Sequence, residues 1–195
     1  PDYPYFGTNN TNPYNLGYKS TTMKGIWNRV RALDLLESLE EVENTKLGCI
    51  GHSLGGHNAV FLTLFDKRIK VLVTSCGICA LKEYVKTNGG NLWGWAQDKY
   101  MPLIERAYKN DPELMPWDFP KIVAAIAPCS VFINAPLHDS NMNYQGNKII
   151  IDKVVPIYQE LNAENELCYV NPDTTHNFPS TIRHKAYEFI DSKLK

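Results

Sequence analysis

The sequence contains no long uninterrupted run of apolar residues, and this absence excludes a membrane-spanning helix of ordinary length within these 195 residues. An excess of charge of one sign is also missing, because 20 basic and 21 acidic residues give a formal net charge of −1. The basic residues are scattered, so no patch that could follow a nucleic-acid backbone is expected. Neither a membrane nor a nucleic acid is therefore predicted as a partner.

A cysteine pattern typical of the common metal sites is missing. The five cysteines include one C-x-x-C pair, Cys76 and Cys79, but no second ligand pair stands at the spacing of a zinc site. The others, Cys49, Cys129 and Cys168, fall in or beside predicted strands, as Cys76 does, where a free thiol acts as a small apolar residue. Buried thiols are favoured over a metal or redox role, and we expect no metal and no cofactor.

An initiator methionine is also absent, since the chain begins with Pro1, and this indicates a processed, clipped or fragmentary product. The length predicts one domain, residues 1–195. A hydrophobic content of 44% and a charged content of 21% are typical of an ordinary globular protein.

Strand and helix patterns alternate along the chain. Apolar, β-rich runs predict strands at 46–50, 69–76, 130–135 and 167–170, and helical periodicity predicts helices at 21–41, 54–62, 148–161 and 180–194. Thr21 and Thr22 are the expected cap of the first helix. Such alternation predicts an α/β fold with a mostly parallel sheet and helices on both faces.

The segment 77–128 interrupts this alternation and is too long for a plain connection. It is rich in aromatic residues, including Trp93, Trp95 and Trp117. We interpret it as a helical cap or insertion that shapes a site. The alternative is a helical cover whose tryptophans are buried against the sheet, and one segment can serve both purposes.

The most informative motif is Gly-x-Ser-x-Gly around Ser53, within Cys49–His57. A predicted strand precedes it and a predicted helix follows it, which is the context of a nucleophile elbow. The turn must be so tight that Ser53 adopts a strained backbone angle, with its hydroxyl above the strand ends. We expect that side chains at Gly51 and Gly55 would both collide across this turn. The alternative is an ordinary strand-to-helix turn that happens to contain a serine.

Two later loops supply the partners that a serine nucleophile needs. Asp139 follows the third predicted strand and His176 follows the fourth, so both are expected at the carboxyl edge of the sheet with Ser53. A histidine must take the hydroxyl proton during attack, and a carboxylate must orient the imidazole and balance its charge. The predicted catalytic residues are therefore Ser53, Asp139 and His176.

Other residues compete for these roles. His52 and His57 flank the serine too closely to reach its hydroxyl, His184 lies inside the last predicted helix, and His138 adjoins the predicted acid. Asp173, in the loop of His176, is the main rival to Asp139, although a turn residue is the favoured interpretation there.

On these residues the chain resembles the α/β-hydrolase superfamily, and within it dienelactone-hydrolase-like and acetyl-xylan-esterase-like serine hydrolases. The resemblance covers essentially the whole chain, and its further carriers are Asp118-Phe119-Pro120 and His176-Asn177-Phe178-Pro179. It implies the α/β-hydrolase fold with Ser53 as nucleophile, Asp139 as acid and His176 as base. Dienelactone hydrolases proper use cysteine as nucleophile, so the serine found here favours ordinary ester hydrolysis.

The resemblance also implies a departure. Family members have several strands before the one that leads to the nucleophile, whereas only a loop and one helix precede it here. The N–H of Leu54 can serve as one oxyanion donor, but the early loop that usually brings the second is not identified. Losing one such donor typically costs about 10²–10³ in rate. We therefore expect an incomplete fold, preferably the C-terminal part of a longer enzyme, or else one completed by another chain.

The leading hypothesis is a serine carboxylic-ester hydrolase that works through an acyl-enzyme, on a small-molecule or carbohydrate ester. Trp93, Trp95 and His52 are the candidate substrate-binding residues, and the two tryptophans suggest an acetylated or aromatic-acylated carbohydrate. The alternatives are a serine peptidase of the prolyl-oligopeptidase type and a hydrolase fold without turnover.

Overall fold

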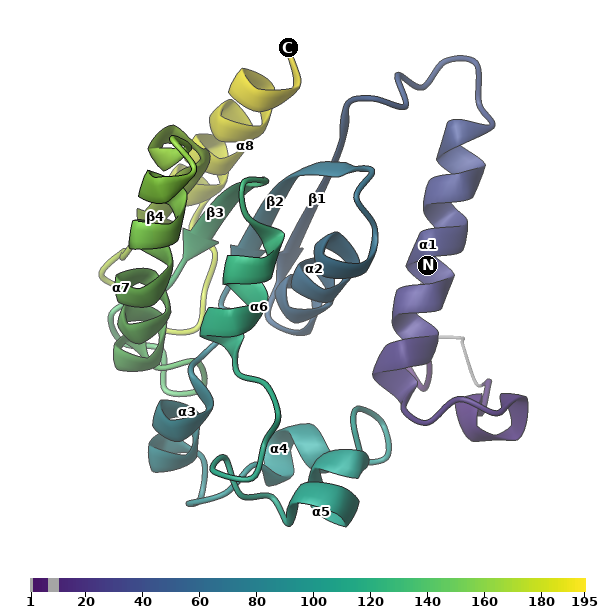
Figure 1. Ribbon diagram of the computed structural model, residues 1–195, viewed down its shortest axis with the longest axis vertical. Helices are drawn as coiled ribbons and strands as arrows, with labels where there is room; N and C mark the ends of the chain where they lie inside the picture. The colour runs from purple at the N-terminus through teal and green to yellow at the C-terminus, as the bar shows by residue number, and fades with distance from the viewer. Residues whose placement is uncertain (1, 7–10) are drawn as a thin grey trace.

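Four parallel strands form one sheet in the computed structural model, which describes residues 2–6 and 11–195 (Figure 1). They are β1 (Leu47–His52), β2 (Ile69–Ser75), β3 (Ser130–Asn134) and β4 (Leu167–Val170), and they lie side by side in that order. All three pairings are parallel. The predicted α/β fold with a parallel sheet is confirmed.

Helices cover both faces of the sheet. Three helices form the layer in front in Figure 1, namely α2 (Leu54–Phe65), α6 (Phe119–Ile126) and α7 (Tyr144–Glu160). The last helix, α8 (Ser180–Leu194), packs on the opposite face against β2 and β3. The first helix, α1 (Thr21–Glu37), packs mainly on α2, and its Leu33 also shares an apolar cluster with Leu47 of β1 and Ile69 of β2. A short 3-10 helix, η1 (Pro13–Leu16), precedes it.

The middle of β2 shows why helices must cover both faces of this sheet. Val71, Leu72 and Val73 are all fully buried, and successive side chains of a strand point to opposite faces. Leu72 belongs to the large core beneath α2, α6 and α7, whereas Val73 packs with Phe132 beneath α8. Each such side chain contributes roughly 1.5–3 kcal/mol when buried. A polar residue on either face of β2 would therefore destabilise the fold.

The first helix begins at Thr21 as predicted but has a different cap, and another helix begins earlier than predicted. Ser20 rather than Thr21 caps α1, because its hydroxyl accepts a hydrogen bond from the N–H of Met23 at 3.0 Å. The α7 helix starts at Tyr144 instead of 148, because the Asn143 side chain accepts from the N–H of Gly146 at 2.8 Å. A short 3-10 helix, η2 (Glu164–Glu166), separates α7 from β4.

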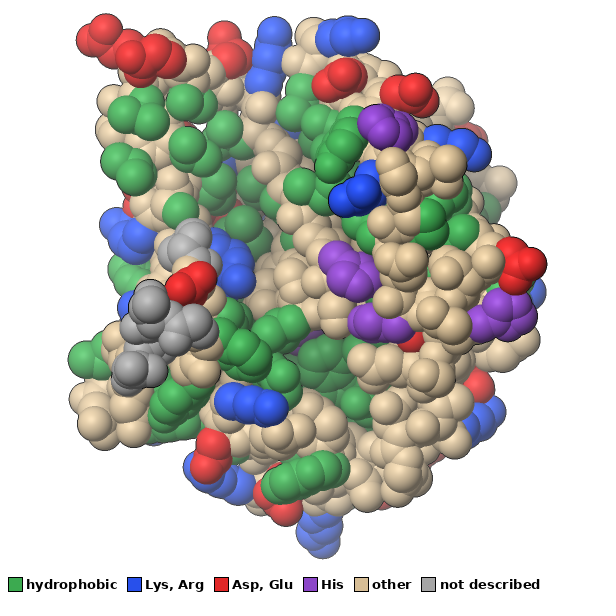
Figure 2. Space-filling model, turned by 180° about the vertical axis from the view of Figure 1, so that it is seen from behind, with side chains coloured by type: hydrophobic (Ala, Val, Ile, Leu, Met, Phe, Trp, Pro, Cys, Tyr) green, Lys and Arg blue, Asp and Glu red, His purple; other side chains and the backbone are tan. Residues whose placement is uncertain are grey.

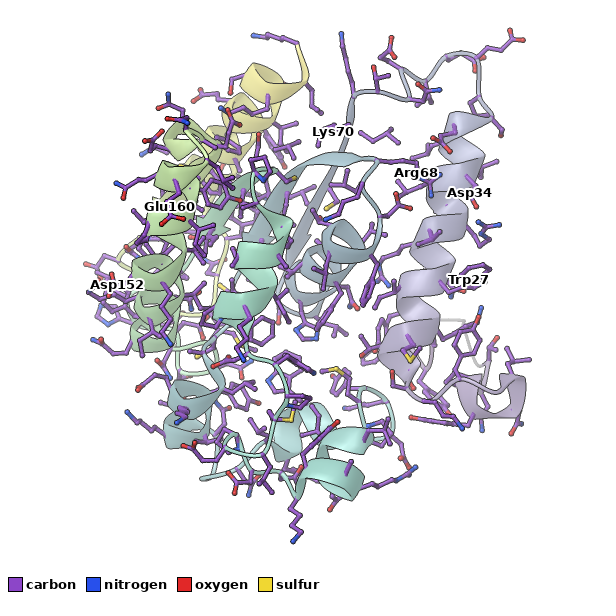
Figure 3. The ribbon with its side chains drawn as sticks, in the orientation of Figure 1. Trp27, Asp34, Arg68, Lys70, Asp152 and Glu160 are labelled. Carbon is purple, nitrogen blue, oxygen red and sulfur yellow. The ribbon has the colours of Figure 1, made fainter. Side chains whose placement is uncertain are left out.

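An ion-pair cluster fastens α1 to the loop between α2 and β2. Arg68 lies 2.7 Å from Asp34 and 2.5 Å from Glu37, both on α1, and its Nε donates to Asp66 at 2.9 Å. Figure 3 shows Arg68 and Asp34 pointing toward one another. The neighbouring carboxylates raise the pKa of the Arg68 guanidinium, so this cation is held by its surroundings.

The segment 77–128 has two parts. Three short helices, α3 (Leu81–Thr87), α4 (Trp93–Ala96) and α5 (Leu103–Tyr108), lie beyond one end of the sheet (Figure 1). The fourth, α6, belongs to the core layer, where it packs against α2 and α7. Asp118 caps α6 and also accepts the N–H of Leu81, which ties the two parts together.

Within the described residues both outer strands of the sheet pair on one side only, β4 with β3 and β1 with β2. The edge at β1 is the one where the sequence predicts missing strands. Ile50 on β1 is 44% exposed, and large apolar side chains are also exposed on α1 and α2, including Met23, Trp27 and Phe65. Figure 2 shows hydrophobic side chains gathered on the side of the molecule where α1 lies. That the fold is incomplete at this edge stays a prediction. Among the helices of residues 2–6 and 11–195, none has both the length and the apolar character needed to span a membrane.

Candidate active site

The carboxyl edge of the sheet collects the chemically reactive side chains. Ser53 follows β1 directly, Asp139 lies in the loop after β3, and His176 lies in the loop after β4. Because all four strands are parallel, their carboxyl ends meet at the same edge. The fold therefore brings together residues that the sequence separates widely.

The turn at Ser53 has the tight geometry of a nucleophile elbow. Ser53 has φ 52° and ψ −121°, in a region that non-glycine residues rarely occupy. Its N–H donates to the carbonyl of Ser75 at 2.7 Å, so the end of β1 remains paired with β2 through the turn. Strain of this kind persists only where the surrounding contacts impose it.

The glycines of the motif do not have equal roles. A Cβ at Gly51 would lie 2.2 Å from backbone atoms of Gly55, and a Cβ at Gly56 would lie 3.0 Å from the backbone oxygens of Gly51 and Ser75. At Gly55, by contrast, an added Cβ meets nothing within 4 Å. The expectation of a collision at Gly55 was wrong, because that position faces outward from the turn; close approach requires glycine at Gly51 and Gly56 instead.

A chain of two hydrogen bonds joins the three predicted catalytic side chains. His176 Nε2 lies 2.8 Å from Ser53 Oγ, across 123 residues of sequence, and His176 Nδ1 lies 2.9 Å from Asp139 Oδ2. This arrangement allows the imidazole to accept the serine proton through Nε2 while Nδ1–H donates to the carboxylate.

Asp139 is held in a fixed orientation. It is 3% exposed, and its second oxygen, Oδ1, accepts the N–H groups of Asn141 at 2.8 Å and Met142 at 2.9 Å. Since both carboxylate oxygens are engaged, the side chain cannot rotate away from His176 without losing several hydrogen bonds. This anchoring is what a residue that orients an imidazole requires.

The competing residues lie elsewhere. His138 Nε2 is paired with Asp173 Oδ1 at 2.7 Å on the exposed surface of the two loops. His184 lies on α8 beside Tyr187, 6.1 Å between ring centroids. His57 is buried beneath the elbow, where burial lowers its pKa to about 3, so the ring is neutral.

The N–H of Leu54 is available for an oxyanion. Leu54 is the first residue of α2, and the first N–H groups of a helix have no intrahelical carbonyl to bond. The helix dipole adds a partial positive charge at the same end. Its position directly after Ser53 therefore suits the stabilisation of negative charge.

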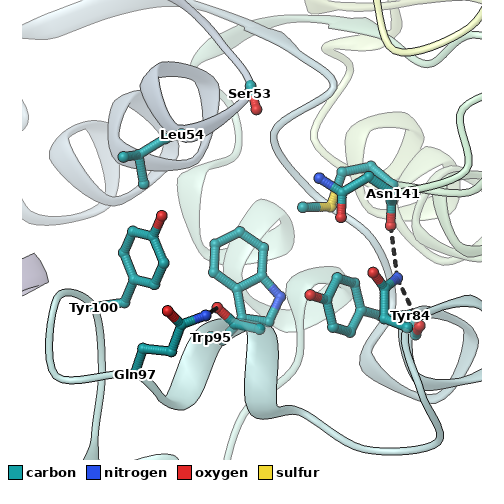
Figure 4. Close-up of a pocket in the computed structure, with 10 residues that line it drawn as sticks. Ser53, Leu54, Tyr84, Trp95, Gln97, Tyr100 and Asn141 are labelled. Carbon is teal, nitrogen blue, oxygen red and sulfur yellow. Dashed lines mark hydrogen bonds between the residues drawn. The ribbon is translucent and has the colours of Figure 1, made fainter.

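A cavity of about 300 Å³ opens beside Ser53 and Leu54 (Figure 4). Its far side comes from the segment 77–128 and from the loop that carries Asp139. The main lining side chains there are Tyr84, Asn88, Trp95, Gln97, Tyr100 and Asn141. Asn88 donates to the carbonyl of Asn141 at 3.0 Å and so links the two walls.

Of the three predicted substrate-binding residues, the structure places only Trp95 in this cavity. Trp93 is 53% exposed and lines a separate surface hollow with Asp98 and Arg106. His52 lines another hollow, next to Phe178 and Tyr187. Trp95 itself is 6% exposed and stacks on His57, with ring centroids 4.1 Å apart and an interplanar angle of 15°. One face of its indole is thus already covered by protein.

Sequence reasoning missed most of the cavity wall. Tyr84, Asn88, Gln97 and Tyr100 belong to a segment without periodic motif, and no local signal singles them out. Only Asn141 could have been found, because it stands two residues after the predicted acid.

A third group lies beside the acid and the base. Cys76 Sγ, Asp139 and His176 offer ligand atoms within 4.8 Å of one another, a set of donors that zinc accepts. The carboxylate and the imidazole are already hydrogen bonded to each other, however, and burial together with Asp139 raises the pKa of the Cys76 thiol to about 12. A metal would need the thiolate, so this arrangement suits proton transfer better than metal binding.

Comparisons with known proteins place this geometry in context. Residues 13–162 match a family model described as glucuronyl esterase, fungi. The 4-O-methyl-glucuronoyl methylesterase of Hypocrea jecorina is 26% identical over 185 residues, covering 86% of this chain and 39% of that protein.

Solved structures share the fold. A carbohydrate esterase family 15 glucuronoyl esterase from Caldicellulosiruptor kristjansonii superposes with a TM-score of 0.78 at 20% identity, covering 98% of this chain and 53% of that one. An acetyl xylan esterase from Paenibacillus sp. R4 gives a TM-score of 0.62 at 19% identity, covering 87% and 52%. The chain thus spans about half the length, or less, of these relatives.

Proposed function

The chain belongs to the glucuronyl esterase family, and from this membership we propose that it carries the Ser-His-Asp machinery of a serine carboxylic-ester hydrolase. The observation that carries the proposal is the continuous hydrogen-bonded chain from Ser53 through His176 to Asp139. It agrees with the expected α/β-hydrolase resemblance, and the family match narrows that resemblance to glucuronyl esterases.

In the first half of the reaction, Ser53 Oγ attacks the ester carbonyl carbon while its proton passes to His176 Nε2, 2.8 Å away. The imidazolium that forms is oriented and balanced by Asp139 through Nδ1–H. The N–H of Leu54 receives the oxyanion of the tetrahedral intermediate. The intermediate then collapses, the bond to the alcohol breaks, and His176 returns its proton to the leaving alkoxide oxygen.

The second half releases the acid. A water molecule loses a proton to His176 Nε2 as its oxygen attacks the acyl carbon, and a second tetrahedral intermediate forms. Its collapse breaks the bond to Ser53 Oγ, which takes the proton back from His176. The enzyme is thereby restored, and the products are one alcohol and one carboxylic acid.

The substrate we propose is an ester of a carbohydrate. The ten residues that line the cavity are all uncharged at neutral pH, and several present amide or hydroxyl groups. Such groups suit the hydroxyls of a sugar, and the relative from Hypocrea jecorina is itself described as a methylesterase of a glucuronoyl ester. A peptidase function has no comparable support in the cavity or in the family match.

The segment 77–128 would act in part as the predicted cap. Its first half supplies Tyr84, Asn88, Trp95, Gln97 and Tyr100 to the cavity wall, while α6 serves the core. We further infer that additional strands, from a preceding segment or another chain, pair with the open edge of β1 and bring the second oxyanion donor.

Labelling with a fluorophosphonate tests the assembled site. We expect a single adduct on the wild-type chain by intact mass and none on Ser53→Ala. His176→Gln should abolish labelling, whereas His138→Gln, a change of the same kind in the exposed pair, should leave it intact. Equal labelling of the two histidine variants would refute the assignment of the base.

Hydrolysis of paired model substrates tests the bond that is cleaved. A methyl glucuronate ester and a peptidyl p-nitroanilide would be compared under identical conditions, with Ser53→Ala as the blank. Hydrolysis of the ester alone supports the proposal. Turnover of the anilide with no ester hydrolysis would favour the peptidase alternative.

A further inference from the structure

Two buried polar residues at the ends of neighbouring strands take no part in the reaction described above. Ser75 ends β2 and Asn134 ends β3, and the two stand opposite each other in the parallel register. Ser75 is 0% exposed and Asn134 is 1% exposed. Polar side chains so deeply buried are costly unless their hydrogen bonds are made, so their partners indicate what they are for.

Asn134 reaches the loop that carries the base. Its Nδ2 donates one hydrogen bond to Ser75 Oγ at 2.8 Å and another to the carbonyl of Asn177 at 3.0 Å. Asn177 follows His176 directly in the chain. Because the two N–H groups of one amide lie in a plane, satisfying both acceptors fixes the amide and with it the backbone beside His176.

Ser75 reaches the other side of the site. Its carbonyl accepts the N–H of Ser53 at 2.7 Å, and its Oγ lies 2.9 Å from Nδ1 of His52, the residue before the nucleophile. Ser75 Oγ thus accepts a hydrogen bond from Asn134 and is also hydrogen bonded to Nδ1 of His52.

The contacts form one path between the two reacting side chains. It runs from the nucleophile turn through Ser75 to Asn134 and on to the loop of His176. The rings of His52 and His176 are also adjacent, with centroids 5.1 Å apart, and His52 stacks with Phe178 from the same loop. Aside from the Ser53–His176 bond itself, these contacts hold the turn and the loop together.

We propose that Asn134 and Ser75 are positioning residues, which hold the loop of His176 in register with the turn of Ser53. This inference rests on the proposed function for its catalytic meaning, but its hydrogen bonds can be tested without turnover. A displacement of about 1 Å between a catalytic pair can cost about 10²-fold in rate. The path therefore sets the geometry on which proton transfer from Ser53 depends.

The first test measures the fluorophosphonate labelling rate, and then kcat and KM for an ester, in Asn134→Ala, Asn134→Asp and Ser75→Ala. The Asp variant keeps the side-chain shape but loses both N–H donors. It therefore separates the loss of the hydrogen bonds from any unfolding caused by the cavity that Asn134→Ala leaves behind. We expect each variant to label ~10–100-fold more slowly, with kcat reduced and KM little changed. The control is Ser130→Ala, which removes a buried hydroxyl at the opposite end of β3 and should label like the wild type.

A second test reads the hydrogen bonds themselves from ¹⁵N-labelled histidine side chains by NMR. We expect the His52 ring signals to shift in Ser75→Ala, and the His176 ring signals to shift in Asn134→Ala and in Asn134→Asp. Ser130→Ala should leave both rings unchanged.

The outcomes separate the two proposals. A wild-type chain that fails to label refutes the proposed function, and the histidine spectra then decide whether the path exists. A wild-type chain that labels, alongside an Asn134→Asp variant that labels equally fast with unchanged ring signals, overturns the positioning role alone.

Discussion

The unequal glycines of the nucleophile turn lead to a sharp prediction. In Gly51→Ala the new Cβ would lie 2.2 Å from backbone atoms of Gly55, and ordinary contact begins at 3.4 Å. The turn must therefore open by about 1.2 Å, and its neighbours are backbone atoms that cannot swing aside. Overpacking of this kind costs about 1–3 kcal/mol, and about 2–4 °C in Tm per kcal/mol for a chain of this size.

Opening the turn also affects the reaction. The Ser53 Oγ to His176 Nε2 distance is 2.8 Å, and adding the same displacement would take it beyond hydrogen-bond range. We expect Gly51→Ala to label with fluorophosphonate about 10²-fold more slowly than the wild type.

The matched variant is Gly55→Ala, where the added Cβ meets nothing within 4 Å. This position lies in the first turn of α2, so alanine should leave Tm unchanged or raise it, by at most ~1 kcal/mol of added stability. Thermal denaturation and labelling rates of the two variants check the reasoning. Equal damage from both substitutions would refute it, because a glycine facing outward from the turn should tolerate a methyl group.

Three further predictions follow from the contacts around the site and the core. Asp139→Asn should lower kcat by about 10⁴, because an amide favours the wrong histidine tautomer, whereas Asp173→Asn should leave kcat nearly unchanged. In steady-state ester hydrolysis, a large loss in Asp173→Asn with little loss in Asp139→Asn would show that the two acids had been assigned the wrong way round. For His57 the folded pKa is about 3 against 6.5 for the unfolded chain, so between these values the unfolded state binds more protons and stability falls as pH falls. The free energy of unfolding, measured by urea denaturation from pH 6.5 to 4, should fall less steeply with falling pH in His57→Phe than in the wild type, by up to about 1.4 kcal/mol per pH unit. Identical slopes in the two proteins would contradict the buried neutral ring. Arg68→Ala should lower the free energy of unfolding, measured in urea, by about 1 kcal/mol at low salt and by less at high salt. The reason is that the ion pairs of Arg68 with Asp34 and Glu37 are partly exposed and are therefore screened by salt. A loss independent of salt would contradict an electrostatic origin.

Most of the strands and helices could be predicted from local patterns in the sequence. The strand before Ser53 and the helix after it are contiguous, so the elbow could be recognised without any distant contact. The strands β2 and β3 were predicted from short apolar runs because a parallel sheet buries both faces of its central strands. The half-buried edge strand β4 was predicted from a shorter run of the same kind. Helix ends and caps were predicted less well. The cap of α1 is Ser20 rather than Thr21, and α7 begins before residue 148 because Asn143 caps it through side-chain geometry that periodicity does not report.

The segment 77–128 shows where such reasoning stops. Its aromatic content indicated a role near a site, but not that Trp95 would line the cavity while Trp93 faces another hollow. Likewise α6 was grouped with the cap, although its apolar face completes the core beside α2 and α7. Both outcomes depend on how irregular chain packs against distant elements, and no local pattern encodes that.

The sequence by itself determined the nucleophile-elbow motif around Ser53 and the parallel α/β frame, because each depends on residues close together in the chain. It also led to the prediction of Asp139 and His176, because each follows a predicted strand. Tertiary structure alone decided that His176, rather than His138, faces Ser53, and that Asn134 and Ser75 join the two loops. It also decided which glycines the turn requires. These outcomes depend on distances across more than a hundred residues, which are set only when the strands align and their side chains fill the space between them.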